Sequence, residues 1–255
     1  GPSVTPACLD RAARPCRSGV ERGGVRAPPL SLFCCTFPAH AVSPRPMIPD
    51  FEFERGAAAR GFRTIAGVDE VGRGPLAGPV TAAAVVFTEG QIPEGLNDSK
   101  KLTARARERL YEEIMSVAVV CVAHATVEEI EEHNILRASH LAMTRALAGL
   151  ACAADYVLID GNMLPRDLAL PAQPVVKGDA RCLSISAASI VAKTVRDNLM
   201  VDLAQQHPGY GWETNMGYGS KSHMAALRDL GVTPHHRRLF KPVHNILYQA
   251  NLLND

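Results

Sequence analysis

The chain has few aromatic side chains and no long apolar run. Its 255 residues are 47% hydrophobic but only 5% aromatic, with a single tryptophan. No run reaches the roughly 18 apolar residues of a transmembrane helix, so we expect no membrane-spanning segment. Cys-x-x-Cys pairs are also absent among its seven cysteines, which argues against a zinc site. The later cysteines stand singly among apolar residues, so we expect free thiols in a reducing compartment, the cytoplasm.

The charge is nearly balanced but unevenly distributed. The formal net charge is +1, whereas residues 1–46 hold six arginines and two acidic residues, giving +4 and leaving −3 for the remainder. This first segment is rich in Pro, Gly and Arg and has no helical or strand period, so we expect disorder. Gly1-Pro2 is typical of a protease-cleavage remnant, and we interpret residues 1–46 as vector-derived or upstream sequence. An Arg-rich targeting peptide is the alternative.

From residue 64 onward, strand and helix patterns alternate. The apolar runs predict strands at 64–69, 80–87, 117–126, 156–159 and 174–176. Helices are expected at 102–116 with Thr103 as the N-cap, at 128–150 with a break near His133-Asn134, at 184–206 and at 222–230. A hairpin followed by alternating elements predicts an α/β fold, a mixed sheet flanked by helices. We divide it into a catalytic domain at 47–206 and a helical, substrate-binding extension at 207–255 that ends in a plain tail from residue 248.

Acidic residues follow three of the predicted strands. They are Asp69-Glu70, Asp160 and Asp179. Strand ends of an open α/β sheet gather at one edge, where four carboxylates would repel one another. Two divalent cations remove that repulsion, and Mg²⁺ and Mn²⁺ prefer oxygen ligands. A single acid here would be a solvated turn residue, but four acids, each close to glycine, favour a metal site.

A glycine-rich turn follows the first acidic pair. Glycines at Gly72-Arg73-Gly74 would let a ligand approach the bare backbone. The turn therefore favours a polymer lying against the metal site, although an ordinary hairpin turn with an exposed arginine fits the same residues.

Six segments, in order, resemble ribonuclease HII, the type 2 ribonuclease H family, in its bacterial single-subunit form. They are Gly67–Val80, Asn97–Leu102, Leu158–Gly161, Lys177–Asp179, Ser186–Asp197 and Gly217–Gly219. The resemblance covers about residues 60 to 245 and implies a ribonuclease H-like fold with a small C-terminal helical extension. The sister family, ribonuclease HIII, ends its acidic quartet in Glu, so Asp179 favours HII.

The resemblance assigns a catalytic and metal-binding role to four acids, namely Asp69, Glu70, Asp160 and Asp179. They would hold two Mg²⁺ or Mn²⁺ ions, with Asp69 bridging them. Asp197 belongs to a helix motif and is not one of the four.

The resemblance also implies residues that contact the substrate. The turn Gly72-Arg73-Gly74 would sense the ribose 2′-OH, which distinguishes RNA from DNA. Tyr218 would pack on the sugar of the next, deoxy, nucleotide, and Lys100 would lie near the scissile phosphate. Two less specific matches, Asn134 and Arg196, would touch the substrate backbone or brace the site. Further candidate phosphate contacts are Lys193, His223 and the basic stretch 228–241.

The implied activity is hydrolysis of RNA in RNA/DNA hybrids and cleavage 5′ of ribonucleotides embedded in duplex DNA. The products would carry a 3′-hydroxyl and a 5′-phosphate, and we expect a monomer. Three alternatives stay open at this point: another two-metal nuclease, a non-catalytic hybrid-binding module and a metal-bound structural protein.

Overall fold

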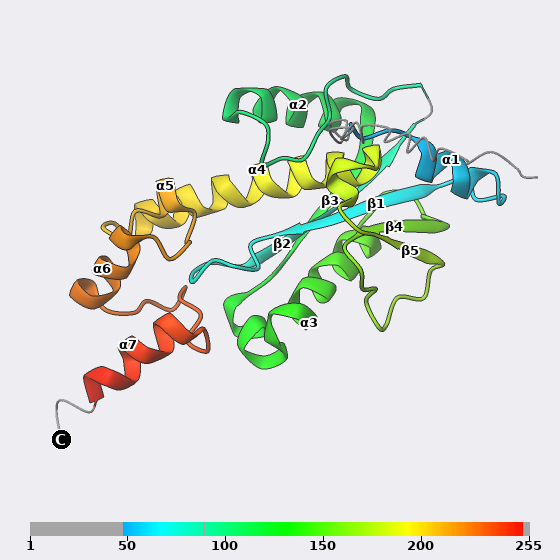
Figure 1. The fold of residues 1–255 in the computed structure, drawn as a ribbon. Helices are drawn as coiled ribbons and strands as arrows, with labels where there is room; N and C mark the ends of the chain where they lie inside the picture. Colours follow the sequence, from blue (N-terminus) through cyan, green and yellow to red (C-terminus); the bar gives the residue numbers. More distant parts are fainter. Residues whose placement is uncertain (1–47, 89, 252–255) are drawn as a thin grey trace, which may run out of the picture. The chain divides into compact units, whose positions relative to one another are not determined.

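The computed structural model describes residues 48–88 and 90–251 (Figure 1). The disorder expected over residues 1–46 lies outside them. The described elements, in chain order, are α1 (Glu52–Ala58), β1 (Ile65–Val71), β2 (Val80–Phe87), α2 (Ala104–Val117), β3 (Ala118–Ala125), α3 (Val127–Ala148), β4 (Tyr156–Asp160), β5 (Ala172–Val175), the 3₁₀ turn η1 (Gly178–Ala180), α4 (Leu183–Gln206), α5 (Trp212–Asn215), α6 (Lys221–Leu230) and α7 (Lys241–Asn251).

The strands form one mixed sheet in the order β3-β2-β1-β4-β5. β1 pairs antiparallel with β2, which confirms the predicted hairpin, and β2 pairs antiparallel with β3. On its other side β1 runs parallel to β4, and β4 runs parallel to β5. The mixed sheet flanked by helices confirms the predicted fold class.

Helices cover both faces of the sheet, with α3 on one side and α2 and α4 on the other (Figure 1). Alternate residues of β2 serve the two layers: Val80 and Ala82 join the cluster under α3, whereas Ala83 and Val85 join the cluster under α2 and α4. A strand buried on both faces needs an unbroken apolar run, which is what residues 80–87 provide.

Close packing of α4 on β1 depends on one glycine. A Cβ at Gly67 would lie 2.2 Å from the backbone carbonyl carbon of Ser184, closer than any side chain allows. The first turns of α4 therefore lie directly against the strand, two residues before Asp69. This packing fixes the position of the acidic strand end.

All nine predicted elements exist, with bounds that shift by up to two residues. Thr103 caps α2 by accepting a hydrogen bond from the Ala106 amide at 3.2 Å. The break in α3 occurs at Asn134, whose φ of 67° is not helical. The sequence did not predict α1, α5 or α7. The plain tail from residue 248 is wrong in its described part, because α7 continues to Asn251.

The C-terminal helices pack on the end of α4 and on the turn after β1. Their shared apolar cluster comprises Leu76, Ala77, Met200, Ala204, Tyr210, Trp212, Ala226, Leu227 and Val243. An antiparallel bridge also joins Ala77 to His236. The division at residue 206 stays a prediction. In the described ranges, no helix is both long and apolar enough to cross a membrane.

Candidate active site

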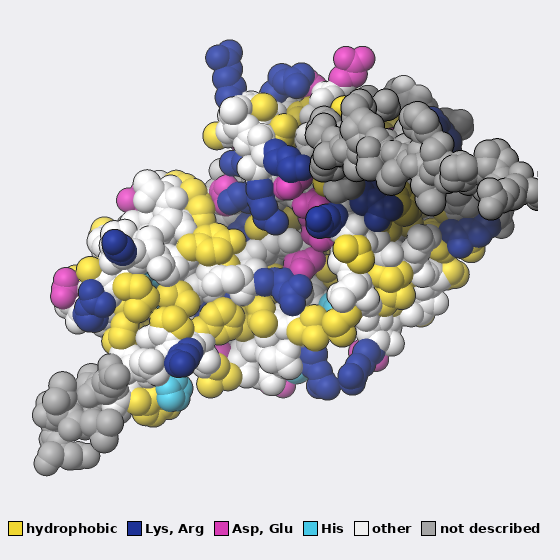
Figure 2. Space-filling model, viewed as in Figure 1, with side chains coloured by type: hydrophobic (Ala, Val, Ile, Leu, Met, Phe, Trp, Pro, Cys, Tyr) yellow, Lys and Arg dark blue, Asp and Glu magenta, His cyan; other side chains and the backbone are white. Residues whose placement is uncertain are grey.

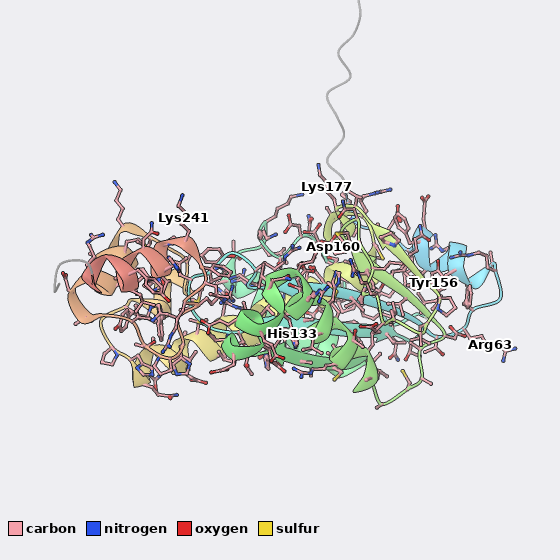
Figure 3. The ribbon with its side chains drawn as sticks, turned by 90° about the horizontal axis from the view of Figure 1, so that it is seen from below. Arg63, His133, Tyr156, Asp160, Lys177 and Lys241 are labelled. Carbon is pink, nitrogen blue, oxygen red and sulfur yellow. The ribbon has the colours of Figure 1, made fainter. Side chains whose placement is uncertain are left out.

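The four acids lie at the ends of three neighbouring strands. Val68 of β1 is level with Ile159 of β4, so Asp69 and Asp160 follow at the same edge of the sheet. Asp160 is level with Val175 at the end of β5, and Asp179 follows in η1. In Figure 3, Asp160 lies between the labelled His133 of α3 and Lys177 of the turn before η1. The structure thus places the acids together, as the strand-end pattern predicts.

Three of the four acids, Asp69, Glu70 and Asp160, are each held by a local contact. The Asp69 carboxylate accepts the Glu70 amide at 2.7 Å. Asp160 accepts the amide of Gly178 at 2.7 Å, which ties β4 to η1. The Glu70 carboxylate pairs with the Arg73 guanidinium at 3.1 Å. These contacts fix the carboxylates without neutralising the group.

Burial and mutual repulsion shape the titration of these acids. Burial raises the pKa of Asp69 well above its ordinary value, and the charges of Glu70 and Asp160 add to the effect. Burial also raises the pKa of Glu70 against the opposing effect of Arg73. The pKa of Asp179 is raised by burial and then by Asp160. Such a cluster is stabilised by positive charge supplied from outside.

The donor set suits a divalent cation. Glu70 and Asp160 line a cavity of about 110 Å³ together with Arg73, Ser139 and His140. The second oxygen of Glu70, Oε2, is buried and has no hydrogen-bond partner in the part of the chain that the structure describes. Carboxylate oxygens are the ligands that Mg²⁺ and Mn²⁺ prefer, and a bound cation would offset the repulsion that helps to raise these pKa values. Within the described residues, however, no three acidic, His or Cys side chains already converge on one point.

Two basic side chains, those of Lys100 and Arg73, lie beside the acids. Burial alone would lower the pKa of Lys100, but the charges of Asp69, Asp98 and Asp179 outweigh it and the pKa is raised. Arg73 reaches Glu70 while its side chain stays 49% exposed. Figure 2 shows acidic side chains near the middle of this face with Lys and Arg side chains around them. An anionic polymer would therefore find positive charge on both sides of the acids.

The glycine turn and Tyr218 meet although they are far apart in sequence. A Cβ added to Gly74 would lie 3.3 Å from the ring of Tyr218, and this residue is 47% exposed. The Tyr218 carbonyl is bonded to Nδ1 of His223 at 2.9 Å. The fold thus brings the predicted ribose-sensing turn and the predicted sugar-packing ring to one place.

Three of the less specific sequence matches have internal partners. Arg196 is fully buried, and it bonds the carbonyls of Pro79, Met216 and Ala77 at 3.0, 3.0 and 3.1 Å. It can brace the site but not touch a substrate. His223 is fully buried too, so a phosphate contact is wrong. Lys193 pairs with Asp197 at 2.6 Å.

Asn134 acts locally in α3. Its side-chain oxygen accepts the amides of Leu136 and Arg137 at 3.0 and 3.2 Å, which restarts the helix after the break. The side chain is exposed, and no contact in the described part of the chain ties it to the acids. Its role toward a substrate stays a prediction.

The most important residue that the sequence did not reveal is Arg237. We expected the whole stretch 228–241 to face a duplex backbone, but Arg237 is fully buried and bonds the carbonyls of Gly72, Arg73 and Gly78. No local pattern distinguishes it from its exposed neighbour Arg238, because its partners lie about 160 residues away. That part of the prediction is wrong.

Known proteins are similar along most of this chain. The family model for ribonuclease HII matches residues 66–243. Ribonuclease HII from Roseobacter denitrificans is 72% identical over 191 residues, which are 75% of this chain and 96% of that protein. Ribonuclease H2 from Pyrococcus horikoshii has a similar structure at 27% identity, with a TM-score of 0.64 over 74% of this chain and 99% of that one.

A more distant structure supports the fold alone. Bst-RNase HIII, solved in complex with Mn²⁺, is 20% identical with a TM-score of 0.57, and the match covers 74% of this chain and 70% of that one. The family match, the high identity to the Roseobacter protein and the ribonuclease H-like neighbours agree with one another. The chain therefore belongs to the ribonuclease HII family, a family of enzymes that act as endoribonucleases on RNA/DNA hybrids.

Proposed function

We propose that this chain cuts duplex DNA on the 5′ side of an embedded ribonucleotide, in addition to the RNA strand of hybrids. The products carry a 3′-hydroxyl and a 5′-phosphate. The observation that supports this proposal is the contact between the glycine turn and Tyr218, directly beside a cluster of four acids. All of these groups come from one chain, which is consistent with a monomer.

The acids would hold two Mg²⁺ or Mn²⁺ ions. Asp69, at the centre of the cluster, would hold them together with Glu70, Asp160 and Asp179. A bound pair of cations supplies charge stabilisation at the attacking and leaving oxygens of the phosphodiester. The unpartnered Glu70 oxygen and the raised pKa of Asp69 support this assignment. Bst-RNase HIII, which has the same fold, was solved with Mn²⁺.

The remaining residues of the site orient the substrate. Lys100 would contact the scissile phosphate, since it lies within the field of Asp69 and Asp179 and is exposed. Backbone groups of the glycine turn would bond the 2′-OH. The exposed ring of Tyr218 would pack on the sugar that follows, where a second 2′-OH would crowd it. Together, the turn and the ring read an RNA-to-DNA step.

Three other functions are the alternatives to this proposal. A general two-metal nuclease needs the acids but neither the glycine turn nor Tyr218. A non-catalytic hybrid-binding module needs the turn but not four intact carboxylates. A metal-bound structural protein needs neither the turn nor Lys100 beside the acids. The combined site favours the ribonucleotide-directed nuclease.

The deciding experiment uses a labelled DNA duplex with one internal ribonucleotide, incubated with Mg²⁺ or Mn²⁺. An all-DNA duplex is the substrate control. Asp160→Asn removes one candidate ligand, and Asp202→Asn removes an exposed carboxylate from α4 as the matched control. We expect one cut, 5′ of the ribonucleotide, by the wild type and Asp202→Asn only.

The other results distinguish the alternatives. Cleavage of the all-DNA duplex would support a general two-metal nuclease instead. Binding without cleavage in either metal would support the hybrid-binding module.

A further inference from the structure

Arg237 is a buried charge without a carboxylate partner. Its Nε and Nη2 bond the Gly78 carbonyl at 2.9 and 2.8 Å, Nη1 bonds the Arg73 carbonyl at 3.0 Å, and Nη2 also bonds the Gly72 carbonyl at 2.6 Å. The ion pairs in the described part of the chain do not include it. Burying a charge carries a large desolvation penalty. Hydrogen bonds must offset this penalty, and all those of the guanidinium go to the turn that follows β1.

These bonds determine which way the peptide groups of the turn face. In a planar trans peptide the N–H points opposite to the C=O. The carbonyls of Gly72 and Arg73 point inward to the guanidinium, so the amides of Arg73 and Gly74 point outward. Neither amide has an acceptor among the described residues, and both residues are exposed. Two successive outward amides make a small concavity that binds anionic or other acceptor oxygens.

Arg196 holds the rest of the same turn. It bonds the carbonyls of Ala77 and Pro79, and a Cβ at Gly72 would lie 2.2 Å from its Nε. The backbone of the C-terminal segment adds the bond from the Arg237 amide to the Leu76 carbonyl at 2.8 Å. Within this clamp, only Arg237 bonds the carbonyls of Gly72 and Arg73.

We propose that Arg237 is a positioning residue that turns the Arg73 and Gly74 amides toward the substrate. It acts through the turn and does not touch the substrate. The proposal rests on the proposed function, in which this turn reads the ribose. It also gives the C-terminal segment a second task besides covering the apolar end of α4, because the segment orients backbone groups about 160 residues earlier in the chain.

The test compares Arg237→Met and Arg237→Lys with Ile114→Ala. Ile114 is a fully buried residue of α2 and belongs to a different apolar cluster, so its variant reports loss of stability alone. We expect Arg237→Met to lose roughly 10- to 100-fold in kcat/KM on the single-ribonucleotide duplex, because small misplacements of orienting groups can cost that much. Lys retains the charge, but its donors all sit on one nitrogen and cannot span the separated carbonyls as the guanidinium fork does, so its loss should be intermediate. Ile114→Ala should stay near wild type at a temperature where all variants are folded.

A second readout does not depend on cleavage. In ¹⁵N-glycine-labelled protein, the Gly74 amide resonance should shift saturably with inorganic phosphate in the wild type and in Ile114→Ala, but not in Arg237→Met. If the wild type fails to cut while this difference persists, the proposed function fails and the positioning role stands. If Arg237→Met and Ile114→Ala cut within about twofold of each other and show the same Gly74 response, the positioning role is overturned.

Discussion

The site contains two clusters of like charge, one of acids and one of arginines, which differ in how far the chain itself compensates their charge. Four carboxylates gather at the sheet edge with too little positive charge nearby, and burial and repulsion raise the pKa of Asp69. Two guanidinium groups, those of Arg196 and Arg237, lie buried beneath the adjacent turn with carbonyl oxygens as their acceptors. Burial lowers the pKa of Arg237 to about 9, which leaves it charged at neutral pH.

The difference indicates what each cluster does. The arginines have internal hydrogen bonds for their charge, so they hold the backbone and need no ligand. The acids have only partial compensation, from Arg73, Lys100 and two backbone amides, and Oε2 of Glu70 is buried without a hydrogen-bond partner among the described residues. A group of carboxylates whose negative charge is not balanced within the chain is suited to bind cations from solution.

Removing one carboxylate should have the largest effect on activity. Asp69→Asn should lower kcat by more than about 100-fold, since even residues that only orient a ligand are typically worth 10- to 100-fold. Single-turnover cleavage of the single-ribonucleotide duplex measures this, with Asp202→Asn as the matched control. Near-wild-type cleavage by Asp69→Asn would show that the acid cluster is not the catalytic centre.

Divalent cations should stabilise the acidic cluster directly. At about 1,000 times the dissociation constant, a cation that binds only the folded chain adds roughly 4 kcal/mol to the free energy of unfolding. Denaturant unfolding with Mn²⁺ or Mg²⁺ against EDTA measures this without any substrate. Asp69→Asn should lose most of the gain, whereas equal stabilisation of both proteins would place the cations elsewhere.

The same cluster predicts a pH dependence in EDTA. Because the pKa of Asp69 is raised on folding, the folded chain keeps a proton that the unfolded chain has released. Its contribution to stability is complete below the unfolded value near 3.8 and is lost as the pH rises through the raised folded value. The melting temperature of the wild type should therefore fall with rising pH more steeply than that of Asp69→Asn. Parallel curves would show that folding does not raise the pKa of Asp69.

Arg196 should respond differently, because its charge is satisfied internally. Lys at this position cannot reach three separate carbonyls, and each carbonyl left unpaired costs about 1–3 kcal/mol. Arg196→Lys should lower the free energy of unfolding by that amount, with or without divalent cations. Arg109→Lys, in an exposed pair with Glu113, is the control and should change it by less than about 1 kcal/mol. A loss that appears only with cations would link Arg196 to the acidic cluster instead.

The sequence predicts the acidic cluster far better than the arginine pair. Acids after strands are a local pattern, and the parallel strands β1, β4 and β5 need only pair for the acids to meet. The burial of Arg237 depends on contacts with Gly72 and Arg73, which no periodicity records. The same holds for α7, a helix beyond the basic stretch whose apolar contacts come from the C-terminal cluster.

The smallest expected effect concerns a buried pair of histidines whose hydrogen bonds are made within the chain. His223 Nε2 accepts the Trp212 indole N–H at 3.0 Å and lies 3.1 Å from His236 Nε2. The Thr233 amide donates to Nδ1 of His236 at 3.0 Å, so His236 must present its proton at Nε2 and both rings are neutral. Burial, with His223 and other neighbouring histidines, lowers the pKa of His236 to about 3.

This pair should weaken the fold in mild acid. Between the ordinary histidine value of 6.5 and about 3, the unfolded chain binds a proton that the folded chain does not, so stability falls as the pH falls. The loss should reach about 1 kcal/mol near pH 5.5. Relative to His236→Asn, the wild type should show this loss together with a change in the fluorescence of Trp212, the single tryptophan. If the difference in the free energy of unfolding between the two proteins does not change with pH, burial does not keep the histidine pair neutral. Internal hydrogen bonds would then not explain why the buried arginines and histidines differ from the four acids.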